Sequence, residues 1–598
     1  MTQFQLKAFK AVFLCLFIIF ASLILFSAPD RVNQTLVISL IPCAGACYLM
    51  IKKTLPGLYG RPGKIPALLL TGLFLFMLSV SEVVRSPLLS SSLPLAVLYV
   101  TYLTCSSFIV IYFFLEYFVS NGDKGNLEVS VHYNRLKDDR RIYRLMPLYI
   151  AAAILFLAAN YPFRPSPDAM TVYDGIMARN WSDWHPIGYV TFVRLCMFLA
   201  SPVACHPFAS CIVQTVLWLL TFHLLCGILY RCTGSARAVN LYRIANLVIF
   251  VPLMYLGIMY KDVLYSMCVL GFCAELYLFL RHKERGRKDF ILITLFSIGV
   301  SLFRHMGIVT TVFPLLVLAV YFCLKKNGQW KKLIISAVFT FLAFFTVTNV
   351  YGSGILHMQK NPDYVKYTVP LYLIGNLSSG HPELFTEEDR QLMEEMMPYE
   401  DWVAAYNLDT YWADNLARDS RIVKERIYRV DEAYGREILK LNFRLLFRSP
   451  SAWTSALFRI TSIVWQIGRP ADGYEWTAAG YYVPEDRPDL ADRQLVTTEK
   501  AITGYLGGLQ YYLEEQPLLS FIYYRGGIWA FILIFLGVVL LLKRKPEFLI
   551  CLLPPALITA MLMITCPSQD PRFVLPAMET AMFLLPAVFY DRFSLSER

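Results

Sequence analysis

The sequence predicts an α-helical polytopic membrane protein with about 14 transmembrane helices and one mainly α-helical external domain. Of the 598 residues, 57% are hydrophobic and only 17% are charged. Soluble chains usually hold about 45–50% apolar and about 25% charged residues, so the additional apolar side chains are expected in lipid. The chain also has 42 Phe, 37 Tyr and 10 Trp residues, which suit the aromatic belts of a membrane protein.

Apolar runs long enough to cross a bilayer, about 17–25 residues each, recur along most of the chain. The first run follows Lys7 and Lys10 as in a signal peptide, but a second run follows closely, so an uncleaved anchor is expected. The expected spans are 11–28, 35–51, 65–84, 93–119, 145–160, 208–230, 241–259, 262–280, 289–303, 306–324, 333–350, 525–542, 547–564 and 571–590.

The Lys and Arg residues alternate between the loops in a way that predicts orientation. With the N-terminus inside, the cytoplasmic loops hold a more than threefold excess of basic residues over the short external loops. Both termini are then cytoplasmic, in a multi-pass protein of the plasma membrane. The net charge of +11 reflects these loops, so nucleic acid is not expected as a partner.

The expected spans divide the chain into four parts. Residues 1–144 form a four-span N-terminal part with a basic cytoplasmic loop, and 145–350 form a transmembrane core that includes an external loop at 161–207. Residues 351–524 form an external domain, and 525–598 add three spans. In the external domain, Thr386 followed by acidic residues indicates a helix N-terminus.

Ten ionisable residues lie at the predicted outer ends of the spans, where charges near hydrocarbon are costly and usually functional. All ten fall on one side, so we expect an external cavity that mixes carboxylates with cations. They are Asp168, Asp174, Asp183, His185, Lys261, Asp262, Arg304, His305, Asp570 and Arg572.

This mixture suits transfer from a lipid-linked phosphate sugar. A carboxylate can take a proton from an acceptor hydroxyl, while Lys and Arg hold the phosphate leaving group. The external loops contain no Asp-x-Asp pair and no His cluster at ligand spacing, and the 14 cysteines form no zinc pattern. We therefore expect neither a metal nor another cofactor.

Five short motifs resemble those of the GT-C glycosyltransferases, which include protein mannosyltransferases and aminoarabinose transferases that use polyprenyl-phosphate sugars. The resemblance covers roughly residues 145–350 and 525–590 and rests on order, spacing and topology. The motifs are Pro165-Ser166-Pro167-Asp168, Ser182-Asp183-Trp184-His185-Pro186, Lys261-Asp262, Phe303-Arg304-His305-Met306-Gly307 and Asp570-Pro571-Arg572-Phe573.

The resemblance implies a GT-C-like core and a catalytic base in the first external loop. Asp168 matches that base best, and Asp183 is the second choice, with His185 beside it. The four spans before residue 145 are an addition to the usual core. The external domain also differs, because relatives more often carry it after the last span, and the Trp-Trp-Asp motif of oligosaccharyltransferases is absent.

The expected function is a metal-independent, inverting transfer of a sugar from a polyprenyl-phosphate donor on the external face. The acceptor is an envelope glycan, lipid or protein. Asp168, Asp183 and His185 are the expected catalytic residues. The donor phosphate is assigned to Lys261, Arg304 and Arg572, with Asp174, Asp262, His305 and Asp570 as further candidates. The alternatives are a transporter or flippase of a lipid-linked saccharide and a polysaccharide polymerase or ligase.

Each candidate also has a plain structural interpretation. Asp168 could cap a short helix, and Arg304 could extend its charged end to the membrane surface. Asp183 could belong to an interfacial turn fixed by Pro186.

Overall fold

The structure is a computed structural model that describes residues 64–78, 93–120, 145–199, 206–282, 286–361, 363–406, 413, 430–468 and 501–591. The expected spans 11–28 and 35–51 and the basic loop at 121–144 lie outside the described residues. Every regular element in the described ranges is a helix, and the one extended pairing recorded there is a bridge between Ser182 and Gln359. The predicted α-helical class is confirmed for this part of the chain.

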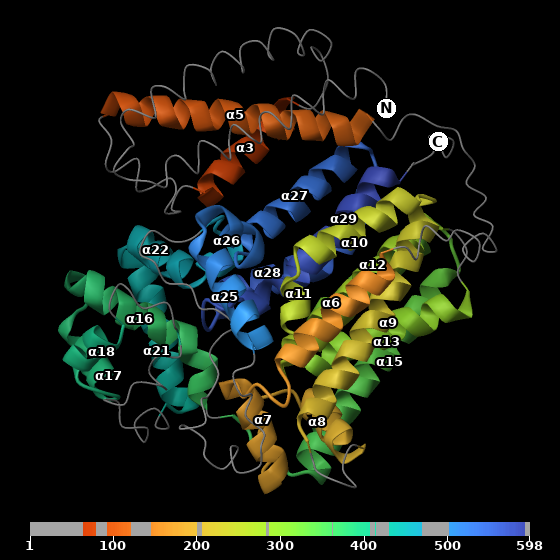
Figure 1. The fold of residues 1–598 in the computed structure, drawn as a ribbon. Helices are drawn as coiled ribbons and strands as arrows, with labels where there is room; N and C mark the ends of the chain where they lie inside the picture. The colour runs from red at the N-terminus through yellow and green to blue at the C-terminus, as the bar shows by residue number, and fades with distance from the viewer. Residues whose placement is uncertain are drawn as a thin grey trace.

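The first half of the described chain forms the walls of a helical bundle (Figure 1). Its α-helices are α3 Lys64–Leu78, α5 Leu93–Ser120, α6 Met146–Ala159, α7 Pro167–Ala178, α8 Ile187–Leu199, α9 Phe208–Thr233, α10 Ala236–Val248, α11 Val251–Met254, α12 Lys261–Arg281, α13 Arg287–Phe303, α14 Gly307–Leu324 and α15 Gln329–Phe345. A π-helix, η4 Thr346–Ile355, continues α15.

The second half first forms a small helical unit and then returns to the bundle. The small unit contains η5 Asp363–Tyr367, α16 Thr368–Gly380, η6 Pro382–Leu384, α17 Glu387–Glu394, α18 Tyr399–Ala405, α21 Glu432–Arg448 and α22 Pro450–Ile460. The returning segments are α23 Ser462–Trp465, α25 Ala501–Glu515, α26 Pro517–Tyr523, α27 Gly527–Leu542, η7 Pro546–Leu552, α28 Leu553–Thr565, η8 Pro571–Val574 and α29 Leu575–Tyr590.

Six stretches of the described chain are helical, long and apolar enough to cross a membrane. Five shorter apolar helices accompany them, namely α3, the 103–119 part of α5, α6, α8 and α27. The six are Phe208–Thr233, Lys261–Arg281, Gly307–Leu324, Gln329–Ile355, Pro546–Thr565 and Pro571–Tyr590. These helices fit a membrane-embedded protein; the expected total of about 14 stays a prediction.

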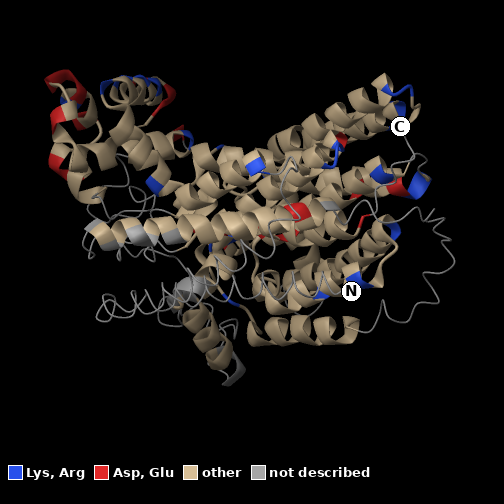
Figure 2. Ribbon diagram, turned by 90° about the horizontal axis from the view of Figure 1, so that it is seen from above, with Lys and Arg blue, Asp and Glu red and all other residues tan. Residues whose placement is uncertain are grey.

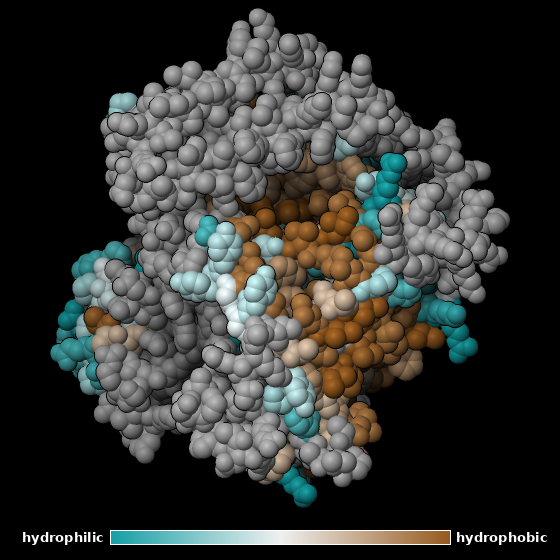
Figure 3. All heavy atoms as spheres, in the orientation of Figure 1, coloured by the Kyte–Doolittle hydropathy of each residue, from teal (hydrophilic) through white to brown (hydrophobic). Residues whose placement is uncertain are grey.

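The central helix of the bundle is α12, which packs against α9, α13 and α29. In its most apolar stretch, 94% of the residues are buried inside the protein. The outer helices instead present large apolar side chains, such as Phe198 and Leu324, on the surface. The visible face of the bundle is accordingly hydrophobic in Figure 3, whereas Figure 2 shows charged residues gathered at helix ends and on the small unit.

The apolar run 241–259 is not one continuous span as the sequence suggests. Helix α10 ends at Val248, α11 is a single turn, and the chain then runs without a helix to Tyr260. Pro252, in α11, has no backbone N–H to donate. The amide of Gln214 on α9 donates to the carbonyls of Leu256 and Ile258 at 3.1 and 3.2 Å, which meets the hydrogen-bonding needs of an irregular backbone among apolar helices. Because of this break, Lys261 is the first residue of α12.

The small helical unit has a hydrophobic core of its own, drawn from residues 367–460 and centred on side chains such as Trp402. Helix α17 begins after Thr386, as predicted, and Asp389 completes a capping box there. Asp389 also pairs with Arg444 and Arg448 of α21, which fastens α17 to α21. Within the segment 351–524, α25 and α26 pack instead with the core of the bundle.

Candidate functional site

Asp168 occupies the first turn of α7, where Ser166 and Pro167 set its position. The Ser166 hydroxyl accepts a hydrogen bond from the backbone N–H of Ala169 at 3.2 Å, so Ser166 caps the helix. The Asp168 carboxylate is therefore not needed as the cap. It accepts a hydrogen bond from the Arg572 guanidinium at 2.6 Å, which joins two positions 404 residues apart in the chain.

The start of α12 contributes one cation and one carboxylate. Lys261 places its ammonium nitrogen 3.0 Å from Nδ1 of His185, in the loop before α8. Asp262 is 1% exposed and lies 3.5 Å from Arg304 and 3.8 Å from Arg572. Lys261 and Asp262 are the first two residues of α12, so both charges lie at the same end of the bundle.

Arg304 and His305 lie in the sharp turn between α13 and α14. Gly307 opens α14, and a Cβ at this position would collide with the carbonyl of Val300, so the turn needs glycine. The Arg304 guanidinium lies over the rings of Tyr265 and Phe573, 5.3 Å from each ring centre. These rings hold the cation by its face and leave its edge to Asp262.

Asp570 and Arg572 lie on either side of Pro571, where η8 begins. The Asp570 side chain accepts from the backbone N–H of Arg572 at 3.1 Å and pairs with its Nε at 2.8 Å. The guanidinium lies 4.5 Å from the centre of the Tyr260 ring. Arg572 is thus the hub of the site, because it faces Asp168, Asp262 and Asp570 together.

These contacts define a charged cluster of three carboxylates and three cations. The numbers are equal, so with every member ionised the cluster has no net charge. An anion added at Arg304 or Arg572 must then displace a carboxylate from its cation, whereas the Lys261 ammonium contacts His185. The members are Asp168, Asp262, Asp570, Lys261, Arg304 and Arg572.

The protonation states of Asp168 and His185 follow from their neighbours. Burial would raise the pKa of Asp168, but the charges of Arg572 and Lys261 outweigh it and hold the pKa well below its usual range. Burial, together with the charge of Lys261, lowers the pKa of His185 to about 3. His185 is therefore neutral near pH 7, and its Nδ1 accepts from the Lys261 ammonium. Its Nε2 then carries the proton, and this buried atom has no hydrogen-bond partner among the described residues.

A second acidic position lies at the rim of the cluster. Asp183 and His305 approach to 3.8 Å, and their side chains are 37% and 47% exposed. Burial raises the pKa of Asp183, against the effect of His305, and burial lowers the pKa of His305. The loop is held by Gln359, whose carbonyl accepts from the Asp183 N–H at 2.9 Å, and by Asn361, whose amide donates to the Asp183 carbonyl at 2.8 Å. Asp183 is thus the more accessible and more basic of the two proposed carboxylates.

The structure brings nine of the ten predicted residues to this end of the bundle. The exception is Asp174, which is exposed on α7 and does not take part in the ion pairs that define the charged cluster. It lies six positions after Asp168, and at about 100° per residue the two side chains leave α7 on different faces.

Four buried residues beside the cluster were not predicted. Tyr260 and Tyr265 supply rings under the guanidiniums. Arg525 donates to the Gln569 side chain at 3.4 Å, and Gln569 directly precedes Asp570. Arg525 heads the apolar run 525–542, so the search for charges at outer span ends could have included it. Within the described residues, no group of three or more His, Cys, Asp and Glu side chains is placed to hold a metal ion.

Fold and site together define an α-helical protein whose apolar helices suit a membrane. At one end of its bundle lies a buried cluster in which carboxylates pair with cations. Residues 70–594 match the family of unknown function DUF6020, and the chain belongs to this family. No curated protein and no solved structure matches the chain.

Proposed function

We propose that this protein is a membrane glycosyltransferase of the GT-C type. In the proposed reaction a sugar passes from a polyprenyl-phosphate donor to a hydroxyl of an envelope glycan, lipid or protein on the external face. The observation that carries the proposal is the meeting of Asp168 with Lys261, Arg304 and Arg572 at one end of apolar helices. A carboxylate beside several cations supplies both groups that the reaction needs.

The proposed step is a single displacement. Asp168 takes the proton of the acceptor hydroxyl, and the oxygen forms a bond to the anomeric carbon. The bond from that carbon to the phosphate oxygen breaks, and the lipid phosphate leaves with the electron pair. Attack from the opposite face inverts the anomeric centre. Arg572, Arg304 and Lys261 stabilise the charge that grows on the departing phosphate.

The contact between Asp168 and Arg572 gives the donor a second role. At 2.6 Å from the guanidinium, and with its pKa held low, Asp168 is a weak base in the empty site. A donor phosphate that takes over Arg572 removes this charge from Asp168 and raises its basicity. The buried Nε2–H of His185 is a suitable donor to a phosphate oxygen in the same position.

A transporter or flippase of a lipid-linked saccharide is the second candidate, and one observation favours it. The broken stretch between α10 and α12 resembles the interrupted helices at which transporters bind substrates. Here, however, the break leads to Lys261 at the end of the bundle, where the other charged residues also lie. A charged cluster at a helix end suits transfer better than passage through the membrane centre. A polysaccharide polymerase or ligase would use the same chemistry with a different acceptor.

The test uses purified full-length protein and a panel of radiolabelled polyprenyl-phosphate sugars, with and without envelope extract. We expect label to move to a new product while free polyprenyl phosphate is released, and we expect both to stop in Asp168→Asn. Asp174→Asn is the matched control, because it removes a carboxylate from the same helix outside the cluster. Tight donor binding with no cleavage in any extract would support transport instead.

A further inference from the structure

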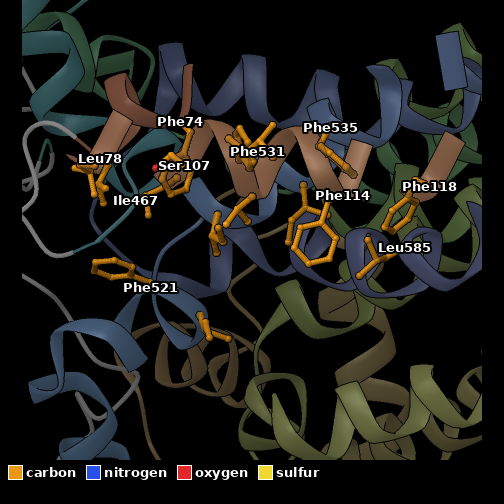
Figure 4. Close-up of a pocket in the computed structure, with 16 residues that line it drawn as sticks. Phe74, Leu78, Ser107, Phe114, Phe118, Ile467, Phe521, Phe531, Phe535 and Leu585 are labelled. Atoms are coloured by element: carbon orange, nitrogen blue, oxygen red, sulfur yellow. The ribbon is translucent and has the colours of Figure 1, made fainter. Parts of the chain in front are cut away.

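An apolar cavity of about 410 Å³ lies between α3, α5 and α27, and none of its lining residues belongs to the charged cluster. Aromatic rings from all three helices, such as Phe74, Phe114 and Phe531, point into it (Figure 4). Ser107 is the one polar side chain among the residues that line it, and its hydroxyl has no hydrogen-bond partner among the described residues. A sugar or nucleotide would lose its hydration here without compensation.

The cavity is long. Its lining on α5 runs from Leu103 to Phe118, which is about 22 Å at 1.5 Å per residue. One leaflet of a bilayer contributes only about 15 Å of hydrocarbon. A cavity of this length and chemistry fits a single linear hydrocarbon chain better than a compact ligand.

One end of the cavity leads toward the charged cluster. At that end lie Leu78, Ile467 and Phe521, at the left of Figure 4. Two further lining residues, Ile522 and Ile528, flank the turn that holds Arg525, which is fully buried.

A chain of buried polar groups continues from this turn. Arg525 donates to the Gln569 side chain at 3.4 Å, and Ser462 donates to the same oxygen at 3.0 Å. The next residue, Asp570, belongs to the cluster and pairs with Arg572. A buried cation, Arg525, therefore connects the turn beside the apolar cavity with the residue next to Asp570 of the charged cluster.

We propose that this cavity binds the isoprenoid chain of the polyprenyl-phosphate donor. The inference rests on the proposed function, since it assigns the tail of the same substrate. The cavity takes one apolar chain, and the cations beyond its end complement a single phosphate at the head of that chain. The walls from α3 and α5 belong to the N-terminal part that precedes the core, so this part acquires a role in binding the donor.

The experiment maps where a benzophenone-bearing polyprenyl monophosphate, without sugar, cross-links to the full-length protein in nanodiscs. We expect cross-linked peptides from α5 and α27. Ser107→Trp places an indole in the cavity and should reduce labelling at least tenfold. Thr101→Trp, on an exposed part of α5, should label within twofold of wild type. Val110→Phe adds a ring to the cavity from the same helix with a smaller increase in side-chain volume. This variant decides the result if Ser107→Trp fails to fold.

Three outcomes would overturn the inference: cross-links on other helices, wild-type labelling in cavity variants that melt like wild type, or equal competition by phosphatidylglycerol. Labelling requires no sugar transfer, so the two proposals fail separately. A protein that labels here but transfers no sugar refutes the proposed function alone. A protein that transfers sugar but labels elsewhere refutes the tail site alone.

Discussion

Replacing Asp168 with Asn removes one negative charge from a charged cluster that is neutral when empty. Arg572 keeps Asp570 at 2.8 Å and Asp262 at 3.8 Å, so the substitution does not leave this buried guanidinium without a carboxylate. We therefore expect Asp168→Asn to fold and to insert as the wild type does. The cluster then carries one net positive charge, which favours an anionic ligand.

The two kinetic consequences have opposite signs. Loss of a general base lowers kcat by about 10²–10⁴-fold. If the bound phosphate lies about 8 Å from the position of this carboxylate, loss of its negative charge at an effective dielectric constant near 20 favours donor binding by about 2 kcal/mol. The Asp168 side chain is 24% exposed, so screening reduces this gain, and we expect donor binding roughly tenfold tighter.

The assay measures kcat by release of polyprenyl phosphate and the donor Kd by equilibrium binding, on the same preparations. Asp174→Asn should leave both values within twofold of wild type. A kcat within tenfold of wild type in Asp168→Asn would refute the role of Asp168 as base. If kcat instead collapses in Asp183→Asn alone, the base is the rim carboxylate, whose raised pKa already suits that task.

The remaining predictions concern charge and packing. Arg572→Met should weaken donor binding at least 100-fold and destabilise the protein by about 3–5 kcal/mol, because it leaves buried carboxylates uncompensated; donor titration and thermal unfolding check both effects. Asp389→Asn should destabilise the small helical unit by about 1–2 kcal/mol, since Arg444 and Arg448 lower the pKa of Asp389 to about 2 after burial is overcome. A lowered pKa stabilises the fold above the unfolded value of about 4 and ceases to do so as pH falls toward 2. The difference in melting temperature should therefore shrink as pH falls to about 2 and vanish below it, and a difference at pH 2 as large as that at pH 7 would contradict this origin. Gly307→Ala should cost about 1–3 kcal/mol by overpacking, and an unchanged melting temperature would show that the turn before α14 can adjust.

Hydropathy was sufficient to predict helices such as α9, α12 and α14 to within a few residues, because apolar length is the main requirement for a membrane span. It could not predict the break before Lys261. The stretch 241–259 is apolar except for Arg243 and Asn246 near its start, and the Gln214 amide that hydrogen-bonds to carbonyls near its end comes from another helix. Local pattern contains no information about such a partner.

The site was predicted from the rule that charges at span ends tend to be functional, and this rule needs only topology. It found both Asp168 and Arg572, although it could not show that the two side chains touch. It also included Asp174, because the sequence places this residue in a loop and therefore does not show on which face of a helix its side chain lies. The tyrosine rings beneath the guanidiniums were missed because Tyr260 and Tyr265 resemble ordinary aromatic residues at a membrane surface.

The neutrality of the charged cluster has a consequence for the order of the proposed reaction. Buried ion pairs are weak sources of stability, and apolar residues often serve as well, so a six-charge cluster calls for a functional explanation. At Arg304 and Arg572 an anion can enter only by taking the cation from a carboxylate, whereas Lys261 contacts neutral His185. The most accessible exchange is at Arg572, where a donor phosphate replaces Asp168. The same event binds the donor and frees the base, so Asp168 becomes an effective proton acceptor only when a sugar is in place to receive the attacking oxygen.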